Sequence, residues 1–283
     1  TTLFGRMLQL LKLTDVKWEF LKDAQKSGSP IARETLVQRC IGDHSILQFV
    51  CEIAKKVTQI ARAPAQHKIA LTLYTVTTIE VLEAVKQVPE QLILTLLPYI
   101  IDGLKAKACP DYQIASYMIV TELFNRALVS AKVLNSVIIH ILKSVPKDTS
   151  VLSLCRPLLP IVSIFQTQSV KSISSKALKR IMKLQHFSEG VREMCREYDM
   201  ESFLSIILKS LISNLCSSDG NSKYAAFLES FTMTVPVHAH VPTIVSSLLE
   251  AHLDAEMTAK QKSLRRLLLH IETHYPNQME KTI

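Results

Sequence analysis

The sequence predicts an all-α protein built as a solenoid of stacked antiparallel helix pairs. Three observations lead to this prediction. The chain has only 6 glycines among 283 residues, well below the roughly 7% of an average protein, and strands with tight turns need more residues that tolerate positive φ. It is 48% hydrophobic and 20% charged, so it can bury a core. Its apolar segments have the length of single helices and are separated by prolines.

Prolines mark the helix boundaries in the middle of the chain. A proline is tolerated in the first turn of a helix because its missing N–H has no partner there. Pro64, Pro89, Pro110 and Pro146 therefore read as boundaries. The helices expected between them cover residues 65–87, 90–107, 111–129, 131–145 and 148–166.

The segment 111–129 shows that its helix is covered from more than one side. Tyr112, Ile119 and Leu123 follow one apolar line, and a second line runs beside it, which makes a stripe wider than a coiled-coil seam. Helix pairs start near 65, 111 and 148, a period of roughly 40 residues that is typical of HEAT or armadillo repeats. In such repeats the apolar faces are buried only when neighbouring pairs stack. The fold class predicted is therefore a HEAT/armadillo-like α-solenoid.

Pro98 lies inside the apolar run "LLPYIIDGL". We expect it to bend a helix that continues through it and to help set the curvature of the stack. The alternative is that Pro98 ends a short helix.

The two ends of the chain also read as helical, with less regular spacing after residue 168. We expect a single solenoid over 1–283, with regular pairs in 1–168 and less regular repeats in 169–283, as part of a longer repeat protein. The stretch "CSSDGNSK" predicts a turn at Asp219, Gly220 and Asn221. The remaining expected helices are 3–13, 15–26, 31–41, 45–62, 174–186, 188–197, 200–217, 222–234, 241–253 and 257–275.

Several classes of protein are disfavoured by composition. The longest apolar stretch, "VLSLCRPLLPIVSIF", is interrupted by Arg156, Pro157 and Pro160, so no membrane span is expected. The cysteines occur singly and without a CxxC pair, which favours buried, reduced thiols over a disulfide framework. They are Cys40, Cys51, Cys109, Cys155, Cys195 and Cys216.

A search for chemistry finds no strong motif. In "HIETH", His270 and His274 lie on one helix face, but Glu272 is not placed as in HExxH and no third ligand stands out. "HAH", with His238 and His240, has no partner cluster either. There is no phosphate-binding loop and no GxSxG elbow, while a Cys–His pair formed only in three dimensions stays open. We expect no enzyme activity, no cofactor and no metal site.

The best functional candidate is a basic stretch. Residues 149–188 contain no acidic side chain, and four cations follow one face of the expected helix 174–186. Such a stripe suits the phosphate backbone of a nucleic acid or another acidic partner. The candidate surface is Lys171, Lys176, Lys179, Arg180 and Lys183.

A structural interpretation of the same stretch stays open. Glu189, Glu193 and Glu197 follow directly, and the cations would face them if the two helices packed antiparallel. A weaker candidate surface is Lys260, Lys262, Arg265 and Arg266.

Parts of the chain resemble a known family. "LQLLKLTDVKWEFLKDAQKSGSPIARETLVQRC", "LLPYIIDGLKAKACPDYQIASYMIV" and "IETHYPNQMEKTI" are similar, in that order, to the amino-terminal part of the large nucleolar HEAT-repeat proteins of the small-subunit processome, the U3 small nucleolar RNA-associated protein ten family. The pattern departs from many HEAT units at Ile114 and Ala115, where Val-Arg is usual, so no ladder of repeat arginines is expected there.

The resemblance implies a non-catalytic scaffold of ribosome biogenesis in the nucleus and nucleolus. The family acts in the early subcomplex on the 5′ external transcribed spacer and supports pre-rRNA transcription and processing. The implied partners are other processome subunits, with pre-ribosomal RNA as a further candidate and no membrane. We expect the isolated chain to be a monomer. The alternative is a transport-receptor-like solenoid that binds protein cargo, although such proteins tend to be acidic and this chain has a pI near 9.1.

Overall fold

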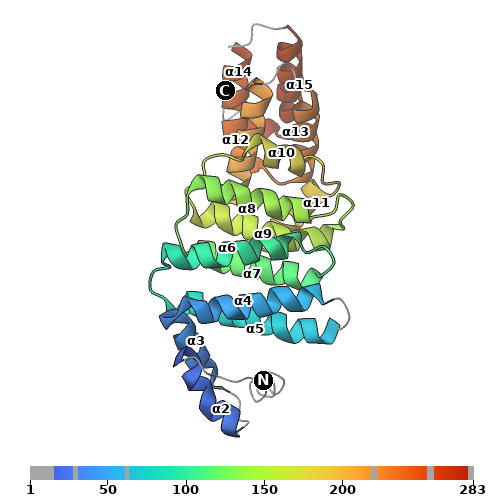
Figure 1. Cartoon of the computed structure of the whole chain (residues 1–283). Coiled ribbons are helices and arrows are strands. Elements are labelled where there is room, and N and C mark those ends of the chain that lie inside the picture. Colours follow the sequence, from blue (N-terminus) through green and yellow to red (C-terminus); the bar gives the residue numbers. More distant parts are fainter. Residues whose placement is uncertain (1–15, 28–30, 61–63, 218–221, 254–257, 280–283) are drawn as a thin grey trace. The chain divides into compact units, whose positions relative to one another are not determined.

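The computed structural model describes residues 16–27, 31–60, 64–217, 222–253 and 258–279. Every regular element in these ranges is a helix (Figure 1). The expected helix 3–13 and the expected turn at Asp219, Gly220 and Asn221 lie outside the described residues. None of the described helices combines the length and the hydropathy that crossing a membrane requires.

The chain divides into two compact units, residues 1–99 and 100–283. The single solenoid expected over 1–283 stays a prediction. The first unit contains η1 (Val16–Leu21), α2 (Lys22–Ser27), α3 (Arg33–Gly42), α4 (His44–Gln59), α5 (Pro64–Ala84) and the first part of α6 (Glu90–Lys105).

In the first unit, α3, α4 and α5 pack on one another. Asp43 caps α4 by accepting a hydrogen bond from the Ser45 N–H at 2.8 Å, and the hydrogen bonds from Ser45 lower the pKa of this carboxyl. Arg33 of α3 forms an ion pair with Glu80 of α5. Local capping and one cross-helix pair thus fix the ends of this bundle.

The second unit begins with the last part of α6 and continues through ten α-helices and one short 3-10 helix among the described residues. These are α7 (Pro110–Arg126), α8 (Ala131–Ser144), α9 (Val151–Thr167), α10 (Ser175–Ile181), α11 (Phe187–Met194), α12 (Glu201–Ser217), α13 (Ser222–Thr234), η2 (His238–His240), α14 (Val241–Leu253), α15 (Thr258–His274) and α16 (Pro276–Met279).

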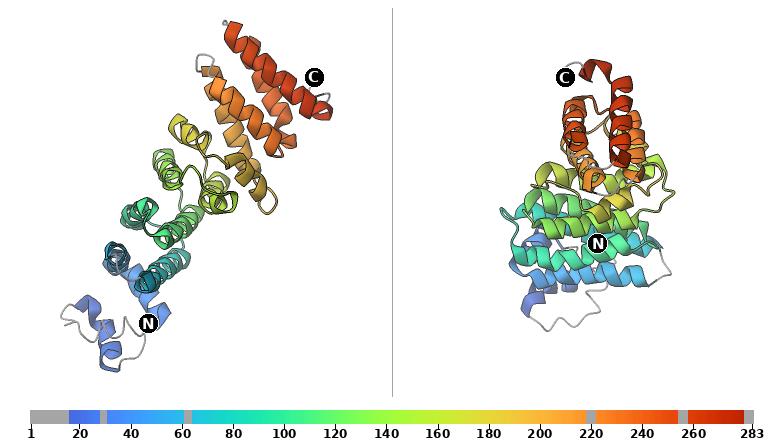
Figure 2. Two further views of the ribbon diagram at one scale, coloured as in Figure 1. Left: turned by 90° about the vertical axis from the view of Figure 1, so that its right-hand side faces the viewer. Right: turned by 90° about the horizontal axis from the view of Figure 1, so that it is seen from above.

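Consecutive helices of the second unit alternate between two layers. In the α8 layer, α8 packs on α10, α10 on α12 and α12 on α14. In the α7 layer, α7 packs on α9, α9 on α11, α11 on α13 and α13 on α15. Figure 2 (left) shows the two layers side by side. Each helix touches the one two positions later in the chain, as helices of stacked pairs do, and this confirms the all-α, HEAT/armadillo-like fold.

The four boundary prolines lie at helix starts or between helices, as predicted, and the bend expected at Pro98 stays a prediction. Pro64 and Pro110 begin α5 and α7. Pro98 lies inside α6, so the helix continues through it and the alternative, in which Pro98 ends a short helix, is wrong. Pro157 and Pro160 likewise lie inside α9.

The predicted helix 174–186 is too long by five residues at its end. The segment 174–186 is helical only as α10, Ser175–Ile181, and turns follow. The N–H of Gln185 leaves the helical pattern and donates to the Lys147 carbonyl at 3.2 Å, in the loop after α8. The helical pattern thus changes to turns after Ile181, with Lys183 and Leu184 bonded to the carbonyls of Arg180 and Ile181, before Gln185 bonds to the neighbouring repeat.

Polar side chains join the layers from one repeat to the next. Gln168, directly after α9, donates to the carbonyls of Phe124 and Ala127 at the end of α7, at 2.6 and 2.9 Å. Tyr275, after α15, donates to the Thr232 carbonyl near the end of α13 at 2.6 Å. The last carbonyls of a helix have no intrahelical partner, so these side chains complete the ends of buried helices.

Gly103 allows α6 and α7 to approach closely. A Cβ at this position would lie 3.0 Å from the Tyr112 carbonyl oxygen and would overlap the Ser116 hydroxyl. Only glycine fits this crossing without moving its neighbours.

Candidate functional site

The basic stretch centres on α10, whose two lysines point to solvent. Ala177, Leu178 and Ile181 are buried, and a turn of 3.6 residues places Lys176 and Lys179 on the opposite side of the helix. Both lysines are exposed. The helix therefore docks by its apolar side with its lysines outward, as the sequence pattern predicts.

Hydrogen bonds from both neighbours fix α10 in the α8 layer. The N–H of Ile173 donates to the Ser210 hydroxyl of α12 at 3.0 Å. On the same side, Ser175 donates to the Asn214 side-chain oxygen at 2.9 Å. The N–H of Ser174 donates to the Asn135 side chain of α8 at 3.3 Å. The two lysines are thus presented from a helix whose N-terminal end is fixed by both neighbours.

Arg180 has a structural partner that the sequence did not indicate. Its Nε donates to the Leu142 carbonyl at 3.1 Å and a terminal nitrogen donates to the Val145 carbonyl at 2.9 Å. Both carbonyls lie at the end of α8, where a cation is favoured by the helix dipole. Arg180 therefore joins α10 to α8, whereas Lys171 and Lys183 lie exposed on either side of α10.

Replacing Arg180 with alanine is expected to lower the free energy of unfolding by about 2 kcal/mol, since two carbonyls of buried residues lose their donors. Lys176→Ala and Lys179→Ala should each change it by less than about 0.5 kcal/mol, as is usual at exposed positions. Urea titration of the three variants measures the difference. Equal stability of all three would contradict the structural role given to Arg180.

The structure separates α10 from the acidic segment that follows it. α11 packs on α9 and α13 in the α7 layer, whereas α10 packs on α8 and α12. Glu193 pairs with Arg196 at 2.7 Å. Among the residues the structure describes, no ion pair joins the lysines of α10 to the glutamates of this segment. The alternative interpretation, in which the cations face their own acidic neighbour, requires α10 to pack antiparallel on α11. In the structure these two helices lie in different layers.

Sequence reasoning missed lysines on the two neighbours of α10. Lys132 and Lys143 of α8 and Lys209 of α12 are exposed. By helical geometry each lies opposite the buried residues of its helix. α8 and α10 contain no acidic residue, and α12 contains one, Glu201, as its first residue. The lack of acids on α8 was visible in the sequence, but its position beside α10 was not.

The weaker candidate surface lies elsewhere and is partly neutralised. Arg266 of α15 forms a two-point ion pair with Glu229 of α13, at 2.8 and 3.0 Å. Arg265 is exposed, and the side chains of Lys260 and Lys262 lie outside the described part. α15 belongs to the α7 layer, so this cluster does not extend the surface around α10.

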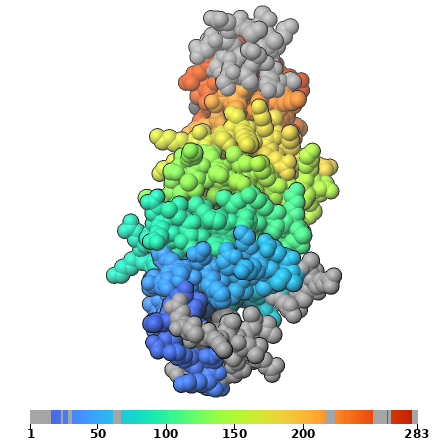
Figure 3. All heavy atoms as spheres, viewed as in Figure 1, coloured from blue at the N-terminus to red at the C-terminus, as the bar shows by residue number. Residues whose placement is uncertain are grey.

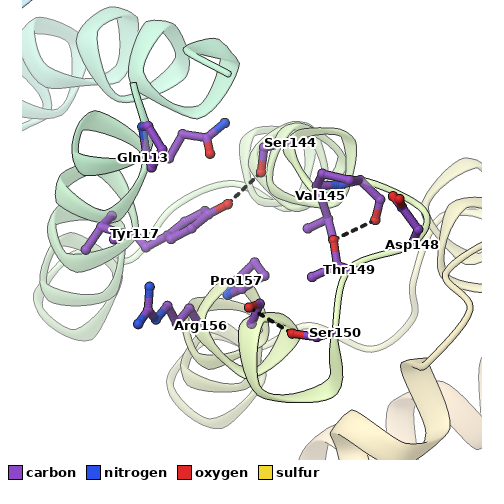
Figure 4. Close-up of a pocket in the computed structure, with 13 residues that line it drawn as sticks. Gln113, Tyr117, Ser144, Val145, Asp148, Thr149, Ser150, Arg156 and Pro157 are labelled. Atoms are coloured by element: carbon purple, nitrogen blue, oxygen red, sulfur yellow. Dashed lines mark hydrogen bonds between the residues drawn. The ribbon is translucent and has the colours of Figure 1, made fainter. Parts of the chain in front are cut away.

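A pocket of about 390 Å³ lies between α7, the end of α8 and the start of α9 (Figure 4). Its hydroxyls are hydrogen-bonded to neighbours: Tyr117 to Ser144 at 2.7 Å and Ser150 to Ser153 at 3.0 Å. Burial raises the pKa of Tyr117, which disfavours its ionised form. The labelled residues do not pair a nucleophile with a base, so the pocket has no arrangement typical of nucleophilic catalysis.

Some of the histidines and cysteines singled out in the sequence have partners or lie in surroundings that disfavour the thiolate. His274 Nδ1 lies 2.8 Å from the His270 carbonyl, and His270 Nε2 lies 3.2 Å from the Thr232 hydroxyl. Burial raises the pKa of Cys195, which lies in a pocket with His238 and His274. A raised thiol pKa lowers the thiolate fraction that a nucleophile needs. In the described ranges no three metal-ligating side chains come together.

Comparison with known proteins confirms the resemblance to the nucleolar family. The family model described as U3 small nucleolar RNA-associated protein 10 matches residues 92–211, a range that includes α7 to α10. HEAT repeat-containing protein 1 of Homo sapiens is 26% identical over 99% of this chain and 14% of its own length. The protein of the same name in Danio rerio is 25% identical over 88% of this chain and 12% of its own length.

An uncharacterised protein of Arabidopsis thaliana is 27% identical over 100% of this chain and 13% of its own length. The chain thus spans 12–14% of the length of these relatives. The similarity extends along the chain, including the region after residue 168 where the sequence pattern is least regular.

Proposed function

Because the chain is homologous over its length to HEAT repeat-containing protein 1, we propose that it is a non-catalytic scaffold segment in ribosome biogenesis. It acts in the nucleolus, within the early small-subunit processome subcomplex on the 5′ external transcribed spacer. There it supports pre-rRNA transcription and processing toward small-subunit rRNA. Its partners are protein subunits of that particle and pre-ribosomal RNA.

The homology carries this proposal, and the architecture supports it. Layers of stacked helices expose long surfaces to several partners at once, which is the common use of repeat proteins. The described thiols with shifted pKa values are all shifted upward by burial, the opposite of what a catalytic thiol needs. A scaffold function uses these surfaces and no reactive group.

Depletion of the protein that contains this chain tests the proposal. After depletion, the amount of small-subunit rRNA should fall and uncleaved precursor should accumulate, as measured by northern blotting. In a separate experiment on undepleted cells, the purified protein should carry U3 small nucleolar RNA with it. Pulse labelling of new precursor separates a transcription defect from a processing defect. Unchanged precursor levels and no U3 RNA in the purified particle would overturn the proposal.

A further inference from the structure

We propose that exposed lysines on three adjacent helices form one surface that binds the sugar-phosphate backbone of RNA without reading its bases. This lysine face consists of Lys132 and Lys143 on α8, Lys176 and Lys179 on α10, and Lys209 on α12, with Lys171 and Lys183 on either side of α10. The choice of RNA rests on the proposed function, whereas the surface itself follows from the structure.

The three helices make the surface continuous. α10 packs on α8 and on α12 within one layer, and α8 and α10 reach the surface as adjoining lime and yellow bands (Figure 3). On each helix the lysines lie opposite the buried residues. The cations of successive repeats therefore emerge on the same side of the layer.

The charges on this face are of one sign. Glu201, at the start of α12, is the single acidic residue on the three helices. No ion pair to these lysines exists in the described part of the chain. A polyanion that lies across the face would meet several uncompensated cations and release its counterions.

The side-chain chemistry favours phosphate over a folded protein partner. Protein interfaces usually centre on buried apolar anchors. Among the described residues of this unit, large exposed apolar side chains on helices are Met118, Leu152, Met233 and Leu269 on α7, α9, α13 and α15 of the opposite layer, and Leu249 on α14 of the same layer. None of those described lies on α8, α10 or α12.

The face also lacks groups that read bases. Its cations are lysines, which act as point charges, while Arg180 is held at the end of α8. Phe203 is the only phenylalanine, tyrosine or tryptophan on the three helices, and it is buried. The imidazole of His140 on α8 is half-buried, with its Nδ1 2.8 Å from the Ser136 carbonyl, so the face presents no large aromatic ring on which a base could stack. Binding should therefore depend on phosphate spacing and salt, with little dependence on sequence.

The test is a salt titration of binding between the whole 283-residue chain and two short single-stranded RNAs of unlike sequence. The face variant carries Lys143→Ala, Lys176→Ala, Lys179→Ala and Lys209→Ala. Each phosphate that is no longer neutralised by a lysine lowers the slope of log affinity against log salt by about 0.7. The slope for the variant should therefore be smaller by up to about 3, and both RNAs should bind on the order of tenfold or more weakly.

A matched control removes the same charge elsewhere, through Lys68→Ala, Lys86→Ala, Lys105→Ala and Lys107→Ala, all at exposed positions. It should bind like wild type. A third variant carries arginine at the four face positions, which keeps the positive charge, and it should retain RNA binding. It shows whether the alanine substitutions weaken binding by removing charge or by altering the fold. Unfolding midpoints of all three verify that each is folded.

Three outcomes would overturn the inference. If the wild-type chain binds neither RNA, the face is not an RNA surface. If the face variant and its control lose RNA affinity equally, binding depends only on the net charge of the chain. Unchanged RNA binding by the face variant, together with abolished binding of polyglutamate, would assign the face to an acidic protein instead. Normal pre-rRNA processing after depletion would overturn the proposed function, whereas an inactive lysine face would leave that function intact.

Discussion

Phe187→Ala is expected to lower the free energy of unfolding of the second unit by about 4 kcal/mol. Phe187, the first residue of α11, is 1% exposed. Its ring centroid lies 6.5 Å from that of Phe203 on α12, and 6.2 and 6.1 Å from those of Phe227 and Phe231 on α13. Truncation of a buried phenylalanine typically costs about 3–5 kcal/mol, and aromatic pairs add to the area term.

Urea unfolding followed by circular dichroism measures this effect. Phe187→Leu keeps most of the volume and should cost roughly 1–2 kcal/mol, because the leucine leaves only a small cavity where the ring packed on its neighbours. Leu152→Ala is the control, since this leucine is 76% exposed and should change stability by less than about 0.5 kcal/mol. A destabilisation by Phe187→Ala no larger than that by Leu152→Ala would mean that the aromatic cluster does not hold α11, α12 and α13 together.

The sequence predicted the helices well where one local rule decides them. Proline in the first turn marked the starts of α5 and α7 within a residue, because its missing N–H has no helical partner there and its fixed φ suits the start of a helix. The pattern after residue 168 looks less regular because α10 and α11 are short, and short helices show little of the 3.6-residue period. The aromatic cluster around Phe187 holds that region together by packing between different helices. The hydrophobic period of a single segment does not reveal such contacts.

The candidate site was predicted only in part, for a related reason. Lys176 and Lys179 follow from the pattern of a single helix, which places them opposite Leu178. Lys143 and Lys209 could not be added, because the packing of α10 on α8 and α12 arises from stacking. Arg180 was assigned to the surface because its position around the helix is similar to that of the lysines. Its hydrogen bonds to carbonyls at the end of α8 depend on how α10 packs on α8, which the sequence pattern of one helix does not show.

Gln168 has a structural role that the sequence pattern does not indicate. The stretch "QSVKSISSK" reads as a polar break exposed to water, and most of it is. Gln168 nevertheless is 6% exposed. Its side-chain oxygen accepts from the Val129 N–H at 3.2 Å, in addition to the two bonds that its nitrogen donates to carbonyls at the end of α7. One amide thus satisfies three backbone groups across a repeat.

Gln168→Leu is therefore expected to lower the free energy of unfolding by about 3 kcal/mol, because three backbone groups lose their partner and each unsatisfied buried group costs roughly 1–3 kcal/mol. Burial of the leucine side chain offsets part of that cost. Urea titration at neutral pH gives the value, and Gln166→Leu is a matched control, since Gln166 is exposed and makes one bond, to the Asp199 carbonyl.

Gln168→Glu separates the hydrogen bonds from the shape of the side chain. At neutral pH the carboxylate cannot donate to the Phe124 and Ala127 carbonyls and places a buried charge against them, so this variant should be less stable than Gln168→Leu. Burial raises the pKa of such a carboxyl above its unfolded value near 4.3. The variant should thus regain stability relative to wild type as pH falls from 7 toward 5, because protonation restores one donor. If the glutamate variant matched wild type at pH 7, Gln168 would not be the donor that closes the end of α7.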